Sequence, residues 1–281
     1  MIQSQRKWRT KREGVKNMIR KEIEGSKVII FSSISEVVQF NRETERTNFY
    51  QSYHTSDETG SGRYSFTKTN SYEEAEDLLL HGWDEMAEKL TKKINNVKCQ
   101  NGYKNKTVYG VQGYQACIPR YLQGMPDSMV SNKRIVTKQK VLNIIKDFGY
   151  SGSTSAQTIE DESIKVLKAV SDLESRGYRV NLSITFVSKY RGKYISMMVK
   201  IKNASQRMNI KQMAFPLVHP SMFRRIVFGM IERLEETKDF GSGYGWCTEY
   251  EETKHLFKGS YFIPRIVCEE EITGIEKYKI N

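Results

Sequence analysis

Cysteine and histidine side chains are the residues best suited to catalysis or metal binding, and in this chain they are scattered. The four cysteines are Cys99, Cys117, Cys247 and Cys268, and none belongs to a Cys-x-x-Cys pair, which argues against a zinc site. Such thiols favour a reduced, cytoplasmic location. The glycine-rich segment 241–246 lacks the Gly-Lys-Ser/Thr ending of a phosphate loop. With no Ser-His-Asp context and no paired-carboxylate motif either, we expect a protein that is not an enzyme and has no cofactor.

Basic side chains carry the stronger chemical signal. The chain has 45 Lys and Arg against 33 Asp and Glu, a formal net charge of +12. Nine basic residues and three acids lie in residues 1–27, and seven basic residues and no acid lie in 189–211. Concentrated positive charge favours an anionic partner, of which nucleic acid is the commonest. The alternatives are a solvated basic helix at the N-terminus and a sheet edge protected by lysines at 189–211.

Two further stretches suit phosphate groups. Residues 89–106 hold six lysines and no acid, with Tyr103 and Tyr109 among or beside them, a mixture that suits single-stranded nucleic acid but also an exposed loop. Arg224 and Arg225 fall in the early turns of a helix predicted after His219, where positive charge opposes the helix dipole unless an anion offsets it. We interpret His219 itself as a cap or core residue. The predicted nucleic-acid contacts are Arg6, Lys7, Arg9, Lys11, Arg12, Lys189, Arg191, Lys193, Arg224 and Arg225.

The elements that must position these residues are clearest in segment 139–187. An apolar, β-branched run, a Gly/Ser/Thr loop, a helical repeat ending at Gly177 and an alternating run predict a βαβ unit with parallel strands. We expect α/β architecture, with residues 133–281 forming a three-layer domain around a mostly parallel sheet. Residues 1–132 should form a smaller, basic, mixed α/β region packed on it. The boundary follows 114–129, which two prolines and a glycine make irregular.

Shorter patterns predict individual elements. A strand is expected at 27–32 and a helix at 34–44, and Ser71 with Glu74 fits a helix-capping box. Met18, Ile19 and Ile23 are spaced to line one side of an N-terminal helix. Arg191 and Gly192 predict a hairpin turn before a strand at 194–201.

Three phrases resemble signatures of an uncharacterised family of bacteriophage proteins. They are SYEEAEDLLLHGW (71–83), IPRYLQGMPDSM (118–129) and AFPLVHPSMFRR (214–225), and their order also matches. The resemblance implies a viral origin, a location in the cytoplasm of an infected bacterial host or in the virion, and other phage proteins or a second copy as possible partners. It implies no activity.

The βαβ unit also resembles the first half of a von Willebrand factor A domain. Members of that family hold a divalent cation with an Asp-x-Ser-x-Ser loop after the first strand. Here Asp147 and Ser151 match, and Gly149 replaces the first serine. The resemblance implies a metal site at Asp147 and Ser151. The alternative is that Asp147 caps the loop and Gly149 permits a tight turn, and the missing hydroxyl leads us to expect no divalent-cation effect on the melting temperature.

Three functions are compatible with these observations. The first is a phage-encoded binding protein that contacts DNA or RNA through its basic surfaces. The second is a virion structural or assembly protein, and the third is a recognition module of the von Willebrand A type with a degenerate metal site. No membrane partner is expected, because no apolar run approaches the roughly 18 residues of a membrane span and the N-terminus is charged from residue 6.

Overall fold

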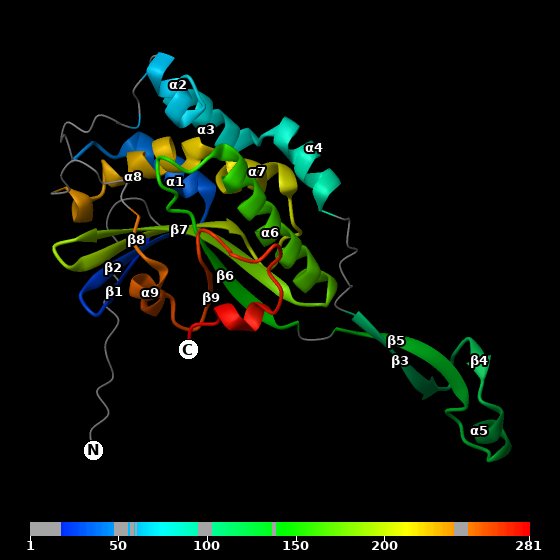
Figure 1. Cartoon of the computed structure of the whole chain (residues 1–281). Helices are drawn as coiled ribbons and strands as arrows, with labels where there is room; N and C mark the ends of the chain where they lie inside the picture. Colours follow the sequence, from blue (N-terminus) through cyan, green and yellow to red (C-terminus); the bar gives the residue numbers. More distant parts are fainter. Residues whose placement is uncertain are drawn as a thin grey trace, which may run out of the picture.

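A six-stranded sheet with the order β1-β2-β8-β7-β6-β9 forms the centre of the molecule (Figure 1). The computed structural model describes residues 18–47, 56, 59, 61–94, 103–136, 139–238 and 247–281. The strands of this sheet are β1 (Ile19–Ile23), β2 (Ser26–Phe31), β6 (Val141–Asp147), β7 (Arg179–Tyr190), β8 (Lys193–Lys202) and β9 (Tyr261–Ile263).

The pairing is mostly parallel. Strand β6 lies parallel to both β7 and β9, and β2 lies parallel to β8, whereas the β1–β2 and β7–β8 pairs are antiparallel hairpins. Helix α6 (Ala156–Ser175) joins β6 to β7. The predicted βαβ unit is therefore confirmed, as is the hairpin turn at Arg191 and Gly192, both of which have positive φ.

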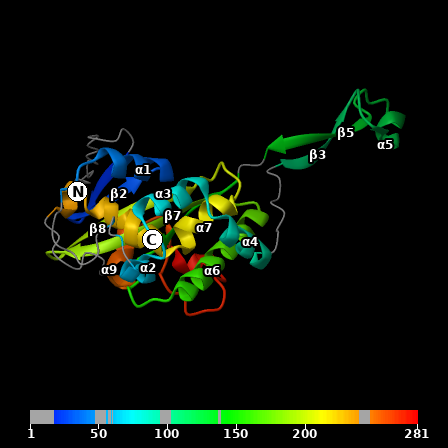
Figure 2. The ribbon, with the colours of Figure 1, turned by 90° about the horizontal axis from the view of Figure 1, so that it is seen from above.

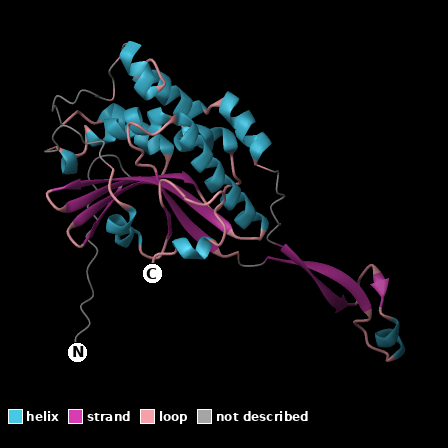
Figure 3. Cartoon of the chain, viewed as in Figure 1, coloured by secondary structure: helices cyan, strands magenta, loops and turns pink. Residues whose placement is uncertain are grey.

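Most helices cover one face of the sheet (Figures 1 and 3). Beside α6 they are α1 (Ile34–Glu43), α2 (Ser61–Thr67), α3 (Tyr72–His81), α4 (Asp84–Lys93), α7 (Ile210–Val218), the π-helical turn η1 (Met222–Val227), α8 (Phe228–Ile231) and η2 (Glu235–Thr237). The opposite face carries α9 (Tyr250–Thr253) and η3 (Lys254–Phe257), whereas Tyr278 of η4 (Ile275–Tyr278) packs into the same core as the helices on the first face. No helix in the described ranges is long and apolar enough to cross a membrane.

Alternation along the strands divides the apolar side chains between the two faces. Leu142 and Ile144 of β6 belong to the large core under the helices, while the next residue, Ile145, packs with Leu256, Phe257 and Phe262 on the other face. The residues of the large core come from almost the whole described sequence, the first being Met18 and the last Tyr278. Residues from both predicted regions therefore share one core.

Several local predictions hold. Strand β2 and helix α1 match the predicted strand and helix, and the Ser71 hydroxyl accepts a hydrogen bond from the Glu74 amide, as an N-cap should. The predicted N-terminal helix is wrong where the structure describes it. Residues 19–23 form strand β1, because Glu24 and Gly25, with φ of 51° and 77°, turn the chain back so that β1 pairs with β2.

A three-stranded arm projects away from this body (Figures 1 and 2). It comprises β3 (Tyr103–Gly110), β4 (Gln115–Ala116), helix α5 (Ile118–Leu122) and β5 (Met129–Val136), in the order β3-β5-β4. The boundary predicted at 132/133 falls inside β5. That division is therefore corrected: the chain before it supplies two strands to the central sheet, and the separate unit is the arm.

Candidate nucleic-acid interface

The arm is held together by backbone pairing and by one arginine. Strand β3 pairs with β5 along its whole length, and the amides of Tyr114 and Cys117 donate to carbonyls of the returning strand segment. The Arg120 guanidinium lies 4.5 Å from the centre of the Tyr109 ring and forms an ion pair with Asp127 at 2.6 Å. These contacts fix α5 against the end of the ribbon.

Exposed apolar and aromatic side chains gather on the arm. Seven of the ten large ones in the described part of the chain lie there: Tyr109, Val111, Tyr114, Ile118, Tyr121, Leu122 and Met125. None of the arm residues from 105 to 133 belongs to either apolar core. Single exposed apolar residues are common on protein surfaces, but a group of them on one element is typical of an interaction site.

Two lysines face each other across the ribbon. Lys106 and Lys133 are register partners of β3 and β5, so their side chains leave the same face, and both are exposed. Neither has an ion-pair partner among the residues that the structure describes. Like charges directly opposite each other destabilise a strand pair. An anion bound between them would remove that repulsion.

The β7–β8 hairpin places its predicted contacts together at one end of the sheet. Lys189, Arg191 and Lys193 all lie within the hairpin, but Lys189 is paired with Glu252 at 3.3 Å. The hydrogen bond with Tyr194 and the charge of Glu252 raise the pKa of Lys189. Arg191 lies over the Tyr190 ring at 5.0 Å. This hairpin is a weaker phosphate site than its sequence indicates.

The same correction applies to the whole 189–211 stretch. Lys202 is buried against Glu174 at 2.5 Å, and Lys211 lies 2.8 Å from Asp84. Acids that are distant in sequence thus offset three of the seven charges, counting Lys189. The surface here carries less free charge than the count along the sequence predicts.

Arg224 and Arg225 are inside the protein, so the prediction that they contact a polyanion is wrong. Arg225 is fully buried and donates to the carbonyls of Ser56 and Thr69, both at 3.0 Å. Arg224 donates to the Phe66 and Gly152 carbonyls and stacks 4.3 Å from the Phe66 ring centre. Burial lowers the pKa of the Arg224 guanidinium. Both arginines fasten the π-helical turn η1 to neighbouring chain segments.

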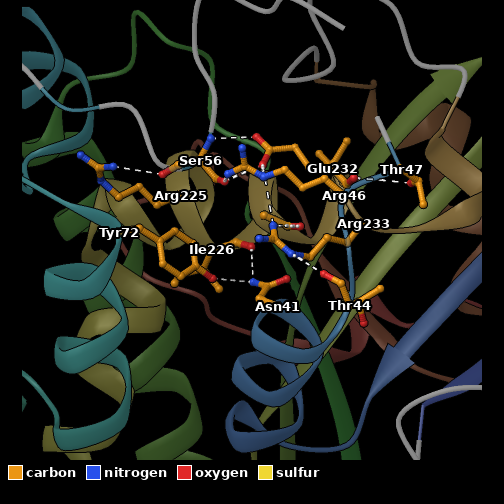
Figure 4. A network of polar contacts seen from close by, with 12 residues as sticks. Asn41, Thr44, Arg46, Thr47, Ser56, Tyr72, Arg225, Ile226, Glu232 and Arg233 are labelled. Carbon is orange, nitrogen blue, oxygen red and sulfur yellow. Dashed lines mark hydrogen bonds and ion pairs between the residues drawn. The ribbon is translucent and has the colours of Figure 1, made fainter. Parts of the chain in front are cut away.

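Figure 4 shows the polar network around Arg225. Glu232 accepts hydrogen bonds from the Ser56 amide at 2.7 Å and hydroxyl at 2.5 Å, and pairs with Arg46 at 3.3 Å. Nearby, the Asn41 amide donates to the Tyr72 hydroxyl at 2.8 Å. Burial raises the pKa of Tyr72 to about 12. The network joins η1, α1 and α3, and its carboxylate, that of Glu232, is buried.

The proposed metal residues lie at the carboxyl end of β6, where Asp147 is the last residue of the strand and Ser151 belongs to the loop that follows. The buried Asp147 carboxylate accepts the Gly149 amide at 2.9 Å, and burial raises its pKa. Ser151 is exposed and its hydroxyl lies 2.9 Å from that of Ser153. Within the described ranges, no group of three His, Cys, Asp or Glu side chains could hold a metal. The hydrogen bond to Gly149 is the loop-capping geometry predicted as the alternative.

Arg6, Lys7, Arg9, Lys11 and Arg12 lie outside the described residues. His219 is buried as predicted: its amide caps α7, and its Nδ1 accepts the Ser221 amide at 3.1 Å. The residues at the end of the arm, 111–122, were not among the predicted site residues. Their only sequence signal is a stretch of Tyr, Gln and aliphatic residues without helix or strand periodicity, which is equally typical of a linker.

These features define a mixed α/β protein with a mostly parallel sheet and a projecting β-arm. A family model described as "Domain of unknown function (DUF7192)" matches residues 16–278, and the chain belongs to that family. Neither the curated proteins nor the solved structures contain a match to the chain.

Proposed function

We propose that this protein binds nucleic acid without catalysing a reaction, and that the arm is its principal contact. The observation that carries the proposal is the pairing of Lys106 with Lys133 on a ribbon whose other exposed residues are largely aromatic, aliphatic or amide-bearing. Between residues 103 and 136 there are five basic residues and one acid, and that acid, Asp127, is paired with Arg120. The arm therefore has cations for phosphates and rings and amides for bases.

The dimensions of the arm support a duplex partner. Strand β3 has eight residues, so the ribbon is about 26 Å long at roughly 3.3 Å per residue. β-Ribbons bind B-form DNA through its major or its minor groove, whereas the major groove of A-form RNA is too narrow for side chains to enter. We accordingly favour DNA over duplex RNA.

The test is the salt dependence of duplex DNA binding by the intact chain, measured by fluorescence anisotropy. The slope of log K against log salt is negative, and each lost phosphate contact reduces its magnitude by about 0.9. Changing Lys106→Gln and Lys133→Gln together should therefore reduce that magnitude by about 1.8 and weaken binding. The matched control is Lys258→Gln with Lys279→Gln, which removes the same charge from exposed positions of the body.

Equal slopes for the arm pair and the body pair would show that binding, if present, follows net charge and not the arm. Absence of binding to DNA and RNA at about 50 mM salt would end the nucleic-acid proposal. It would then favour the second candidate, a virion structural or assembly protein. The observation behind that candidate is the open outer edge of β3, on which a second copy could add a strand.

The proposals of a phage origin and of kinship with von Willebrand factor A domains rest on the sequence resemblances given above. The parallel β6–α6–β7 unit supports the second of these. Under that proposal Asp147 and Ser151 would be remnants of a cation site. Melting curves with and without Mg²⁺ test it, and a shift that disappears in Asp147→Ala would support a functional site.

A further inference from the structure

The end of the arm differs in chemistry from its strands. Beyond β3 and β5, the most exposed aliphatic residues are Leu122 at 78%, Val111 at 75% and Ile118 at 67%. Tyr114 and Tyr121 are exposed to a similar degree, at 65% and 69%. We call this group of five residues the tip. It contains no charged residue.

The tip keeps its shape without packing its own apolar side chains. A Cβ at Gly113 would collide with the Val130 carbonyl, so the backbone is tightly folded there. Arg120 bridges Tyr109 and Asp127, and the Cys117 amide donates to the Ser128 carbonyl at 2.7 Å. The apolar groups are thus presented on an already folded support, which reduces the ordering cost of burying them in a partner.

Position along the arm suggests what the tip reaches. Lys106 lies four residues before Gly110, the last residue of β3, or about 13 Å at roughly 3.3 Å per residue. The minor groove of B-form DNA is roughly 7.5 Å deep. With the lysine pair on the phosphates, the tip extends far enough to meet the base pairs.

The neighbours of the tip residues favour bases over lipid. Gln112, Gln115 and Gln123 are exposed and directly follow Val111, Tyr114 and Leu122. Amide side chains form hydrogen bonds with base edges, whereas burying them in lipid hydrocarbon leaves donors and acceptors unsatisfied. The lysines of the arm also disfavour pairing with a second, equally basic arm.

We propose that the tip is a wedge that enters a groove of duplex DNA and partly unstacks one base step with its aliphatic side chains. Wedges of Leu, Ile or similar residues unstack and kink DNA in this way from the minor groove. The inference rests on the proposed function, because the lysine pair must first hold the arm on the duplex. The five tip residues would set the bend, and the lysines the affinity at low salt.

The experiment uses the intact chain and a duplex of about 30 base pairs. Permanganate oxidises unstacked thymines, so its reactivity at each thymine reports insertion, and energy transfer between dyes on the two ends reports bending. The wild type should increase permanganate reactivity at least about threefold at one or a few steps and shorten the end-to-end distance. Leu122→Gln should abolish both signals while leaving the salt slope unchanged, since no charge is removed.

The matched control is Ile266→Gln, which makes the same kind of change at an exposed position of the body. It should behave as the wild type. Binding with a normal salt slope but no unstacking, or unstacking unaffected by Leu122→Gln, would overturn the wedge and leave the proposed function standing. No binding to duplex DNA would overturn the wedge, and no binding to RNA either would overturn the proposed function as well. If in addition the chain floats with vesicles of anionic lipid and Leu122→Gln does not, the tip is a membrane contact.

Discussion

In the body, several basic side chains are buried, whereas in the arm two lysines face solvent together with apolar groups. Arg225, Lys146 and Lys202 are each at most 2% exposed, while Lys106 and Lys133 stand free on the ribbon. The buried Lys146 ammonium donates to the carbonyls of Pro264 at 2.5 Å and Arg265 at 2.7 Å. A buried cation is tolerated only when its donors are satisfied in this way. A count of basic residues in the sequence therefore indicates an interaction surface only when the buried ones are left out of it.

The largest effect should come from a buried cation of the body. Arg225→Ala removes a donor from the buried carbonyls of Ser56 and Thr69, and we expect a loss of about 3 kcal/mol or more in the free energy of unfolding. Urea denaturation measures it. The control, Arg207→Ala at an exposed position, should cost less than about 0.5 kcal/mol. Similar midpoints for the two variants would contradict the structural role of Arg225.

Excision of the arm should separate stability from binding. If residues 103–136 are replaced by a short Gly/Ser linker, the melting temperature should change by less than about 3 °C, since none of the arm residues from 105 to 133 belongs to the core. Duplex DNA affinity should fall at least about 100-fold, or about 2.7 kcal/mol. Calorimetry and anisotropy give the two numbers. Retained affinity would move the interface to the body.

The body should also respond to acid through His219. Burial lowers its pKa from 6.5 to about 4, so the unfolded chain binds a proton between these values and the folded chain does not. This contribution to stability is present above pH 6.5 and is lost as the pH falls toward 4. By pH 5 the wild type should lose about 2 kcal/mol more than His219→Asn, relative to pH 7.5. Parallel pH profiles of the two proteins would disprove this.

The smallest effect should come from the β7–β8 hairpin. Changing Lys189, Arg191 and Lys193 together to Gln should reduce the magnitude of the salt slope by less than about 1, because Lys189 already has an acidic partner. Anisotropy titrations at several salt concentrations measure this. A reduction larger than that of the Lys106 and Lys133 pair would reverse the comparison and make the hairpin the principal contact.

Local patterns in the sequence predicted much of the fold. The βαβ unit, the cap at Ser71 and the Arg191–Gly192 turn depend on neighbouring residues and on one type of periodicity, and all three were predicted correctly. Ile19 and Ile23 fit a helix as well as a strand. The antiparallel pairing of β2 with β1 decides in favour of the strand, and the spacing of these residues alone does not show that pairing.

The candidate site was harder to predict, for two physical reasons. Charge is visible in a sequence but burial is not, so Arg224 and Arg225 resembled a phosphate site although backbone carbonyls surround them. The arm, for its part, leaves the body after α4 and returns at β6. A sequence cannot show that such an irregular stretch comes back to the same core, and a boundary between two regions was predicted instead.

The attachment of the arm has a mechanical consequence. Strand β5 ends at Val136 and β6 begins at Val141, so tension on the arm is passed to β6, an inner strand of the sheet. Strand β6 is hydrogen-bonded on both sides, to β7 and to β9, and both neighbours run parallel to it. A pull along β6 therefore loads these bonds together in shear, and they do not open one after another.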